Sequence, residues 1–304
     1  VDLGSGTGTL GISLAGSTNA SLEALDRDAC AAAFTRRNAT KNDLSDATIL
    51  TELLLPEYPG EGLELVVSNL PAKAGEPVLR LLIHQITHRA ARSGGESAVV
   101  VVKPLADTLS SVLEELGTQP IAERRTANHA AVIYRCTHPT ADAPEREPLP
   151  QAFVRTHAAF QGPAHPYEMD TVHNLPEFDG LAFRTALAFD LLRSTKIGGP
   201  AAVLGCGQGH IPLGLLQRAG KEFELVLADR DLLALRATAH NLESHGAQAD
   251  RTVVVPAPAA LTEHLAPGSL KWLVVNDDPV PGSNWNQEVL AASRELLRPD
   301  GKLL

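Results

Sequence analysis

A glycine-rich turn occurs twice in this 304-residue chain, and the residues around it recur in the same order. Val1–Gly8 reads V-D-L-G-S-G-T-G, and Ala202–Gly209 reads A-V-L-G-C-G-Q-G. The two turns lie 201 residues apart, the distance from Gly8 to Gly209. Self-similarity at a fixed spacing is the signature of an internal repeat, and it decides the architecture before any single element does. The chain is therefore expected to contain two copies of one structural unit.

Further landmarks keep this order in both copies. An aspartate ends an apolar run at Asp26 and again at Asp229, and an asparagine follows each of them twelve residues later. An apolar run that ends in polar residues comes next, and a turn before a final apolar run completes the set. These landmarks are Asn38 with Asn241, Ser68–Asn69 with Asn276–Asp277, and Ser93–Gly95 with Arg298–Gly301. Preserved order at offsets of 201–208 residues indicates a tandem duplication rather than chance.

Apolar runs alternate with helical patterns in the first copy. Strands are expected at 1–3, 21–25, 63–67 and 98–102, and helices at 9–15, 28–38, 75–92 and 105–116. Residues 124–126 and 130–134 look like a closing pair of strands, and the continuous apolar run at 98–102 is typical of a strand buried on both faces. This alternation predicts an α/β fold with two tandem Rossmann-like domains, each on a mostly parallel, doubly wound sheet.

The segment between the copies has the composition of a linker, since it is rich in proline and charged residues. The expected organisation is a first domain over 1–139, a linker over 140–150, and a lead-in with the second domain over 151–304. A helix is expected within the lead-in at 181–192. The first copy begins inside its first strand and the second stops in its fifth, so we expect the sequence to be a fragment trimmed at both ends.

Composition excludes several classes of protein. No window approaches the ~18–20 apolar residues that a membrane span needs, and no signal peptide is visible. A formal net charge of −10 means that overall attraction cannot drive nucleic-acid binding, although a local basic patch still could. The cysteines Cys30, Cys136 and Cys206 are odd in number and far apart, which indicates a reducing compartment and no zinc site. The histidines His84 and His88 are four residues apart, as in a metal-binding pair, but no third ligand is evident. We therefore expect a cytoplasmic protein without a metal site and without a membrane partner.

The first glycine turn allows more than one chemical interpretation. A glycine-rich turn between a strand and a helix lets the backbone approach a ligand closely and directs amide N–H groups at it. Gly6–Gly11 also fits the dinucleotide fingerprint G-x-G-x-x-G, with Asp26 about 20 residues further on. One alternative is therefore an NAD-dependent oxidoreductase, although the chain has no Tyr-x-x-x-Lys motif. A second alternative is a tight turn that binds no ligand. A third is a module that binds a cofactor or RNA without catalysing a reaction.

Four motifs together resemble class I S-adenosylmethionine-dependent methyltransferases. They are D-x-G-x-G-x-G from Asp2, the acid Asp26, the asparagine Asn38, and S-N-L-P over Ser68–Pro71. The sequence is most similar to the "small domain" methyltransferases, a group that includes ribosomal RNA guanine-N2 methyltransferases built from two tandem domains. The resemblance covers nearly the whole chain apart from the linker and lead-in. It implies two seven-stranded methyltransferase sheets, both truncated here, and Asn38 is expected to cap or pack within its own helix.

The resemblance implies S-adenosylmethionine as the cofactor and a role for each matching residue. Asp2 would contact the methionine part, and the glycines would let the backbone pass beneath it. Asp26 would accept hydrogen bonds from both ribose hydroxyls, as a carboxylate can. Glu52 would lie near the adenine amine, with a solvated loop acid as the alternative. The implied cofactor-binding residues are Asp2, Gly4, Gly6, Gly8, Asp26, Arg27, Glu52 and Asn69.

The resemblance also implies catalytic residues after the fourth strand. Enzymes of this superfamily with the motif N-P-P-[F/Y/W] methylate nitrogen, because the asparagine side chain and the next carbonyl accept hydrogen bonds from a planar amine. The resemblance implies these two roles for Asn69 and for the carbonyl of Leu70. The nitrogen lone pair is then in line with the methyl group, and catalysis is mostly positioning. This chain has N-L-P-A, in which Pro71 stiffens the loop and Ala72 replaces the aromatic residue. The expected reaction is N-methylation of a ribosomal RNA base, with Lys73 either meeting an anionic substrate group or solvated.

The second copy keeps the glycines and the acid Asp229 but not the other motifs. Val203 stands where the first copy has Asp2, and Asn276–Pro279 reads N-D-D-P in place of N-L-P-A. We therefore expect a degenerate second domain that supports the first or presents its substrate. The tandem ribosomal enzymes have an eroded first copy, so the order is reversed in this chain.

Overall fold

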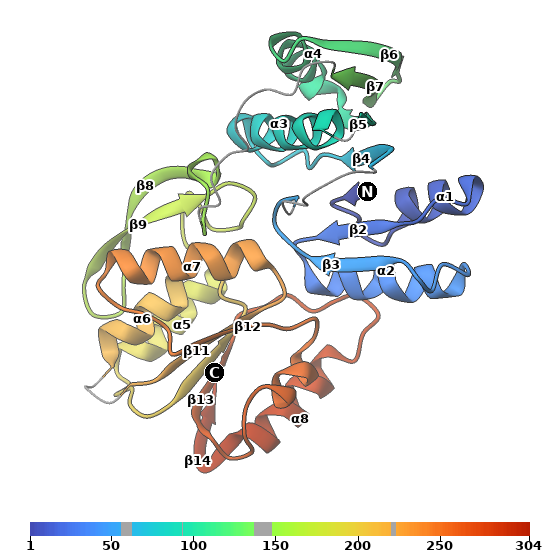
Figure 1. Ribbon diagram of the computed structural model, residues 1–304. Coiled ribbons are helices and arrows are strands. Elements are labelled where there is room, and N and C mark those ends of the chain that lie inside the picture. The colour runs from blue at the N-terminus through green and yellow to red at the C-terminus, as the bar shows by residue number, and fades with distance from the viewer. Residues whose placement is uncertain (56–62, 93, 137–147, 220–222) are drawn as a thin grey trace. The chain divides into compact units, whose positions relative to one another are not determined.

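The computed structural model describes residues 1–55, 63–92, 94–136, 148–219 and 223–304 (Figure 1). These residues form two compact units, Val1–Phe153 and Val154–Leu304, each with its own central sheet. Most of the linker that the sequence predicts at 140–150 falls outside the described residues.

The first unit is built on a seven-stranded sheet with the order β3-β2-β1-β4-β5-β7-β6. Strand β7 is antiparallel to both of its neighbours, and the other pairs are parallel. Figure 1 shows the strands in this order from β3 to β6. The strands are β1 (Asp2–Leu3), β2 (Glu23–Asp26), β3 (Thr48–Thr51), β4 (Leu65–Asn69), β5 (Glu96–Val102), β6 (Thr118–Arg125) and β7 (His129–Cys136). The helices are α1 (Thr9–Thr18), α2 (Ala29–Lys41), α3 (Glu76–Arg92), η1 (Lys103–Leu105), α4 (Ala106–Glu115) and η2 (Gln151–Phe153).

Local sequence explains where these helices begin and which face they bury. Asp28 caps α2, because its carboxylate accepts the amides of Cys30 and Ala31. Parallel crossovers are right-handed, so α1 and α2, which step toward the β3 edge, lie on the opposite face from α3, which joins β4 to β5. Helix α3 buries an apolar stripe made of Val78, Leu79, Leu82, Ile83 and Ile86.

The second unit repeats the first five strands of this plan as a parallel sheet in the order β12-β11-β10-β13-β14. The two sheets confirm the predicted tandem Rossmann-like fold. The strands are β10 (Ala201–Leu204), β11 (Leu225–Asp229), β12 (Arg251–Val254), β13 (Leu270–Val275) and β14 (Leu297–Leu303). The helices are α5 (Phe183–Arg193), α6 (His210–Arg218), α7 (Leu232–Ser244), η3 (Pro258–Glu263) and α8 (Trp285–Leu296).

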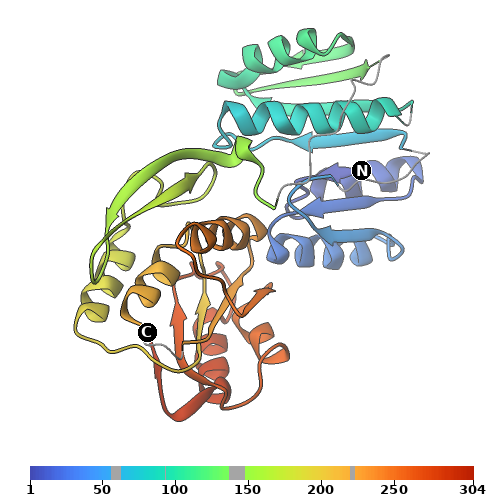
Figure 2. The same cartoon turned by 60° about the vertical axis from the view of Figure 1, so that its left-hand side comes forward.

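The lead-in contains a two-stranded ribbon that the sequence does not reveal, β8 (Val154–Gln161) with β9 (Pro166–Val172), visible as a long hairpin in Figure 2. The Gln208 side chain accepts the amide of Val172 at 2.9 Å and donates to its carbonyl at 3.1 Å. Asn241 binds the backbone of Asp170 in the same two-way manner, at 3.0 and 2.9 Å. The second glycine turn and α7 therefore hold the ribbon through side chains.

Strand β5 differs in one respect from the prediction of a strand buried on both faces. Val99 and Val101 are buried, whereas Ala98, Val100 and Val102 are half-buried. The reason is that α3 and α4 pack against β5, and among the described residues their side of the strand is the better covered.

Cysteine, metal and membrane features add little to the fold. Cys30, Cys136 and Cys206 all lie within the described residues and form no disulfide with one another. The part of the chain that the structure describes contains no group of three His, Cys, Asp or Glu residues arranged to hold a metal ion. None of its described helices combines the length and the apolar character needed to span a membrane.

Candidate functional site

The predicted site residues of the first unit gather at one edge of its sheet. Strands β1 to β4 are parallel, so the turn after β1, Asp26–Arg27 at the end of β2, Glu52 after β3 and Asn69 at the end of β4 share the carboxyl edge. The register pairs Leu3 with Ser68, which places the turn level with Asn69. In open α/β sheets, ligands bind outside the carboxyl ends of the strands where the strand order reverses, here between β1 and β4.

The glycine turn leaves open space on this edge. Gly4, Gly6 and Gly8 have φ angles of 73°, 58° and 82°, in the left-handed region that favours glycine. A β-carbon on Gly4 or Gly6 would meet none of the described atoms within 4 Å, whereas one on Gly8 would lie 2.6 Å from Cδ1 of Ile12. Gly8 is therefore required by packing, and Gly4 and Gly6 form an open cradle for a ligand.

Asp26 both shapes the turn and offers a binding group. Its Oδ2 accepts the amide of Gly6 at 2.8 Å, and its Oδ1 accepts the amide of Asp28 at 2.9 Å. The residue is half-buried, and a carboxylate has about four lone-pair positions, so both oxygens keep capacity for further donors. These acceptor oxygens and the open space beside Gly4 and Gly6 fit the adenosine and methionine parts of S-adenosylmethionine.

Helix α2 holds the turn from the other side. Thr35 Oγ1 donates to the carbonyl of Gly6 at 3.0 Å, and Asn38 Nδ2 donates to the carbonyl of Thr7 at 2.8 Å. The expectation that Asn38 caps or packs within its own helix was wrong, because the turn is the nearer acceptor for its amide. Sequence reasoning missed Thr35, although both copies carry a threonine nine residues after the strand-two acid.

Asp2 joins the sheet to α1. It is 1% exposed, and its Oδ2 accepts the amide of Gly11 at 2.9 Å. Burial raises the pKa of Asp2 above its ordinary value. The second copy has Val203 and Pro212 at these two positions, so the carboxylate and the donating N–H are lost together. An unpaired buried polar group, which is costly, is thereby avoided.

The chain around Asn69 is fixed on both sides. Ser68 Oγ donates to the carbonyl of Leu3 at 2.8 Å, and the amide of Leu70 donates to the carbonyl of Val100 at 2.9 Å. Leu70 is buried, whereas the side chains of Asn69 and Pro71 are exposed. These contacts hold the Asn69 side chain at the surface of the carboxyl edge, beside the cradle.

The equivalent edge of the second unit is approached by its own chain at one glycine of the turn. A β-carbon on Gly205 would lie 2.6 Å from the amide nitrogen of Asp277, in the loop after β13. Arg184 of α5 donates to Asp278 Oδ1 at 2.7 Å and so ties the same loop to the lead-in helix. The loop that replaces N-L-P-A therefore lies against Gly205, whereas a β-carbon on Gly207 would meet no described atom within 4 Å.

The acid of the second unit is also out of reach. Asp229 is 5% exposed, and its Oδ2 accepts the amide of Cys206 at 2.6 Å. Burial raises the pKa of Asp229 to about 7. Asp229 is thus less exposed than its half-buried counterpart Asp26.

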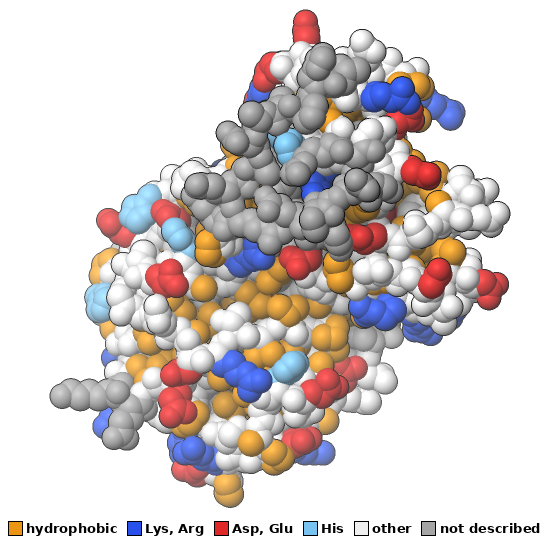
Figure 3. Space-filling view, viewed as in Figure 1, with side chains coloured by type: hydrophobic (Ala, Val, Ile, Leu, Met, Phe, Trp, Pro, Cys, Tyr) orange, Lys and Arg blue, Asp and Glu red, His pale blue; other side chains and the backbone are white. Residues whose placement is uncertain are grey.

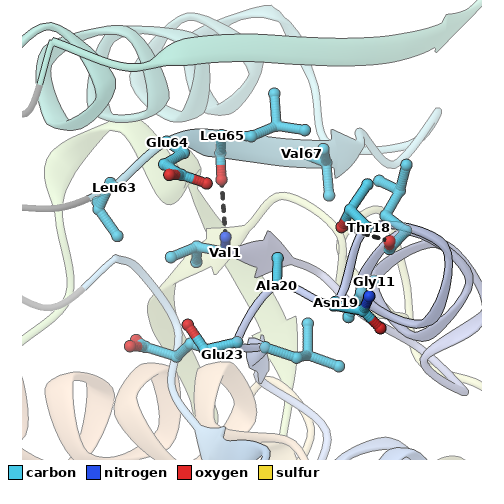
Figure 4. Close-up of a pocket in the computed structure, with 14 residues that line it drawn as sticks. Val1, Gly11, Thr18, Asn19, Ala20, Glu23, Leu63, Glu64, Leu65 and Val67 are labelled. Atoms are coloured by element: carbon cyan, nitrogen blue, oxygen red, sulfur yellow. Dashed lines mark hydrogen bonds between the residues drawn. The ribbon is translucent and has the colours of Figure 1, made fainter.

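A cavity of about 650 Å³ in the first unit lies apart from this site (Figure 4). Its lining includes Val1, the α1 residues Gly11 and Thr18, and residues 63–65 at the start of β4. The cavity thus lies toward the amino ends of the strands, and its lining contains none of the predicted cofactor-binding residues.

Comparisons with known proteins agree with the geometry. A family model described as "Methyltransferase small domain" matches residues 1–125. The chain is similar in fold to a T. thermophilus 16S rRNA N2 G methyltransferase solved with AdoMet and guanosine, at 18% identity and a TM-score of 0.65, over 96% of this chain and 75% of that one. A ribosomal protein L11 methylase from Lactobacillus delbrueckii subsp. bulgaricus matches at 21% identity and a TM-score of 0.40, over 45% and 69% of the two chains. No curated protein matches significantly.

The sheet also argues against a dinucleotide-binding fold. That fold has the strand order 3-2-1-4-5-6, whereas here the antiparallel β7 is inserted between β5 and β6. Over residues 1–125 the first unit therefore matches the methyltransferase small domain, and the chain shares its fold with a methyltransferase solved with AdoMet.

Proposed function

We propose that the first unit methylates a nitrogen atom of a ribosomal RNA base in the cytoplasm, and that the second unit supports it or presents the substrate. The observation that carries the proposal is the exposed Asn69 at the end of β4, level with the open glycine turn. When bound there, S-adenosylmethionine supplies an electrophilic methyl group. The similar T. thermophilus structure adds support, since its name gives an rRNA guanine N2 activity.

The residues after β4 orient the acceptor. In the proposal, Asn69 Oδ1 and the carbonyl of Leu70 accept two hydrogen bonds from a planar amine. The amine plane is then set by the protein, and its lone pair points toward the cradle. Pro71 restricts the loop, so this arrangement exists before the substrate binds, and the rate gain is one of positioning.

Cofactor binding is assigned to the first unit alone. Asp26 would hold the ribose, the glycines would carry the methionine part, and Glu52 would lie near the adenine. Asp2 and Arg27 complete the proposed set from positions that are buried and half-buried. The second unit is excluded from this role because the Asp277 backbone lies against Gly205.

RNA binding would depend on local contacts. The net charge is −10, and acidic and basic side chains are interspersed on the face seen in Figure 3. Lys73 follows β4 and Lys103 follows β5, and both are exposed. Because these strands end at the same edge, the two ammonium groups can meet phosphates next to the target base.

Transfer of tritiated methyl from S-adenosylmethionine to purified ribosomal RNA tests the proposal. Nucleoside digestion and mass spectrometry should then find the label on a base nitrogen. An Asn276→Ala variant is the matched control and should keep the activity, because that asparagine follows the closed second turn. A chain that binds the cofactor but labels no RNA would contradict the proposal. That result would favour the second candidate function, a module that binds the cofactor without catalysing a reaction. Ala72, which stands in place of an aromatic residue, is the observation that favours this candidate.

A further inference from the structure

We infer that Thr35 and Asn38 are positioning residues for the cofactor, which hold the glycine turn from α2 in the shape that receives it. The inference rests on the proposed cofactor site of the first unit. Neither side chain needs to touch the cofactor, because both act through backbone carbonyls of the turn.

Three consecutive peptide groups of the turn are held by side chains. The Gly6 amide donates to Asp26 on β2, and the Gly6 carbonyl accepts from Thr35 on α2, at 2.8 and 3.0 Å. The next carbonyl, that of Thr7, accepts from Asn38 at 2.8 Å. Thr35 is 0% exposed, so water cannot easily replace its hydroxyl. The orientation of the turn is therefore set by β2 and α2 together.

The second unit shows what these contacts do where the cradle is closed. Thr238 Oγ1 donates to the carbonyl of Gly207 at 3.4 Å, and Asn241 Nδ2 donates to the carbonyl of Gln208 at 3.0 Å. The glycines of that turn also have positive φ angles, 87° at Gly205 and 55° at Gly207. The same side chains thus accompany the same turn shape in both units, including the one in which the Asp277 backbone lies against Gly205, and this recurrence supports a role for them in shaping the turn.

The physical consequence is preorganisation. A turn with three glycines has access to many backbone conformations, and ordering one residue costs about 1–2 kcal/mol. A turn that is already ordered in the free protein avoids this cost when the cofactor binds. Loss of either contact should therefore weaken cofactor binding without removing any group that touches the cofactor.

Calorimetric titration with S-adenosylhomocysteine tests the inference on the full chain. Thr35→Val keeps the shape of the side chain but removes the donor, and Asn38→Ala removes the amide. We expect each to raise the Kd by about fivefold to tenfold, the size of one lost hydrogen bond. Thr35→Ser keeps the hydroxyl and should stay within about twofold. Thr238→Val makes the same change in the second unit and should leave the Kd unchanged.

The possible results distinguish failure of the positioning role from failure of the proposed cofactor site. If the unaltered chain binds no S-adenosylhomocysteine, the proposed cofactor site itself is wrong. If it binds, and Thr35→Val and Asn38→Ala bind equally tightly, the positioning role is wrong. A variant that only unfolds would lower the number of sites per chain at an unchanged Kd, and that result would also overturn the inference.

Discussion

A β-carbon added to Gly205 would lie 2.6 Å from the amide nitrogen of Asp277, so the chain itself occupies the space beside its second glycine turn. At the equivalent Gly4, an added β-carbon would have no described neighbour within 4 Å. Two turns of the same sequence pattern therefore differ in the space beside their first glycine. The chain is expected to hold one cofactor molecule, in its first unit.

Replacement of Asn69 should separate catalysis from cofactor binding. Asn69→Ala removes the side-chain acceptor for the substrate amine, while the contacts of Ser68 and Leu70 keep the loop in place. We expect methyl transfer to fall roughly a hundredfold, because misplacement of the acceptor by about 1 Å has an effect of this size. S-adenosylhomocysteine affinity should change by less than about threefold. Equal losses of transfer and affinity would assign Asn69 to the cofactor instead.

Two glycines of α1 offer a matched pair for the contact between Asp2 and α1. A β-carbon on Gly11 would lie 2.8 Å from Asp2 Oδ2 and from Leu22 Cδ1, whereas Gly16 has open space around it. Gly11→Ala should lower the free energy of unfolding of the first unit by about 1–3 kcal/mol, the typical cost of overpacking. Gly16→Ala should be neutral or stabilising by up to about 1 kcal/mol, since alanine favours the helix. Hydrogen exchange of the α1 amides measures both, and similar values for the two variants would count against this contact.

Asp229 makes the stability of the second unit depend on pH. Burial raises its pKa from 3.8 to about 7, so the folded state binds this proton more tightly than the unfolded chain does. The stabilising contribution is complete below about pH 4 and is lost as the pH rises toward 7. From Asp229 alone, the free energy of unfolding should fall by up to about 4 kcal/mol between these limits. His210 acts in the opposite direction, because burial lowers its pKa and its protonation below pH 6.5 destabilises the fold.

Tryptophan fluorescence can follow this effect in the intact protein. Trp272 and Trp285 are the two tryptophans of the chain, and both belong to the second unit. Urea unfolding should be recorded for the unaltered chain and for Asp229→Asn at several pH values from about 4 to 8. The difference between the two proteins should change steeply with pH, because His210 and the other groups are common to both. Parallel curves would show that Asp229 does not titrate in this range.

Much of the site could be predicted because parallel strands bring their carboxyl ends together. Asp26 and Asn69 each end a strand that pairs with β1, so their sequence positions were enough to place them beside the turn. Thr35 could have been found in the same way, from the threonine that recurs before each asparagine of α2 and α7. A repeated spacing carries structural information even when the residue has no known catalytic role.

The features that sequence reasoning did not predict depend on contacts between distant segments. Gln208 lies in the variable slot of the second turn, and no local pattern indicates that it pairs with Val172. The approach of Asp277 to Gly205 likewise depends on how the loop after β13 folds back. The sequence predicted a degenerate second copy, but not that its own chain lies against Gly205.

Titration of the chain with S-adenosylhomocysteine, alone and as the Asp26→Ala and Asp229→Ala variants, tests the single-site claim most directly. We predict one site per chain, which Asp26→Ala abolishes and Asp229→Ala leaves intact. Tryptophan fluorescence and circular dichroism should confirm that both variants are folded. Two sites in the unaltered chain, or binding that disappears with Asp229→Ala and persists with Asp26→Ala, would contradict the assignment of the cofactor to the first unit.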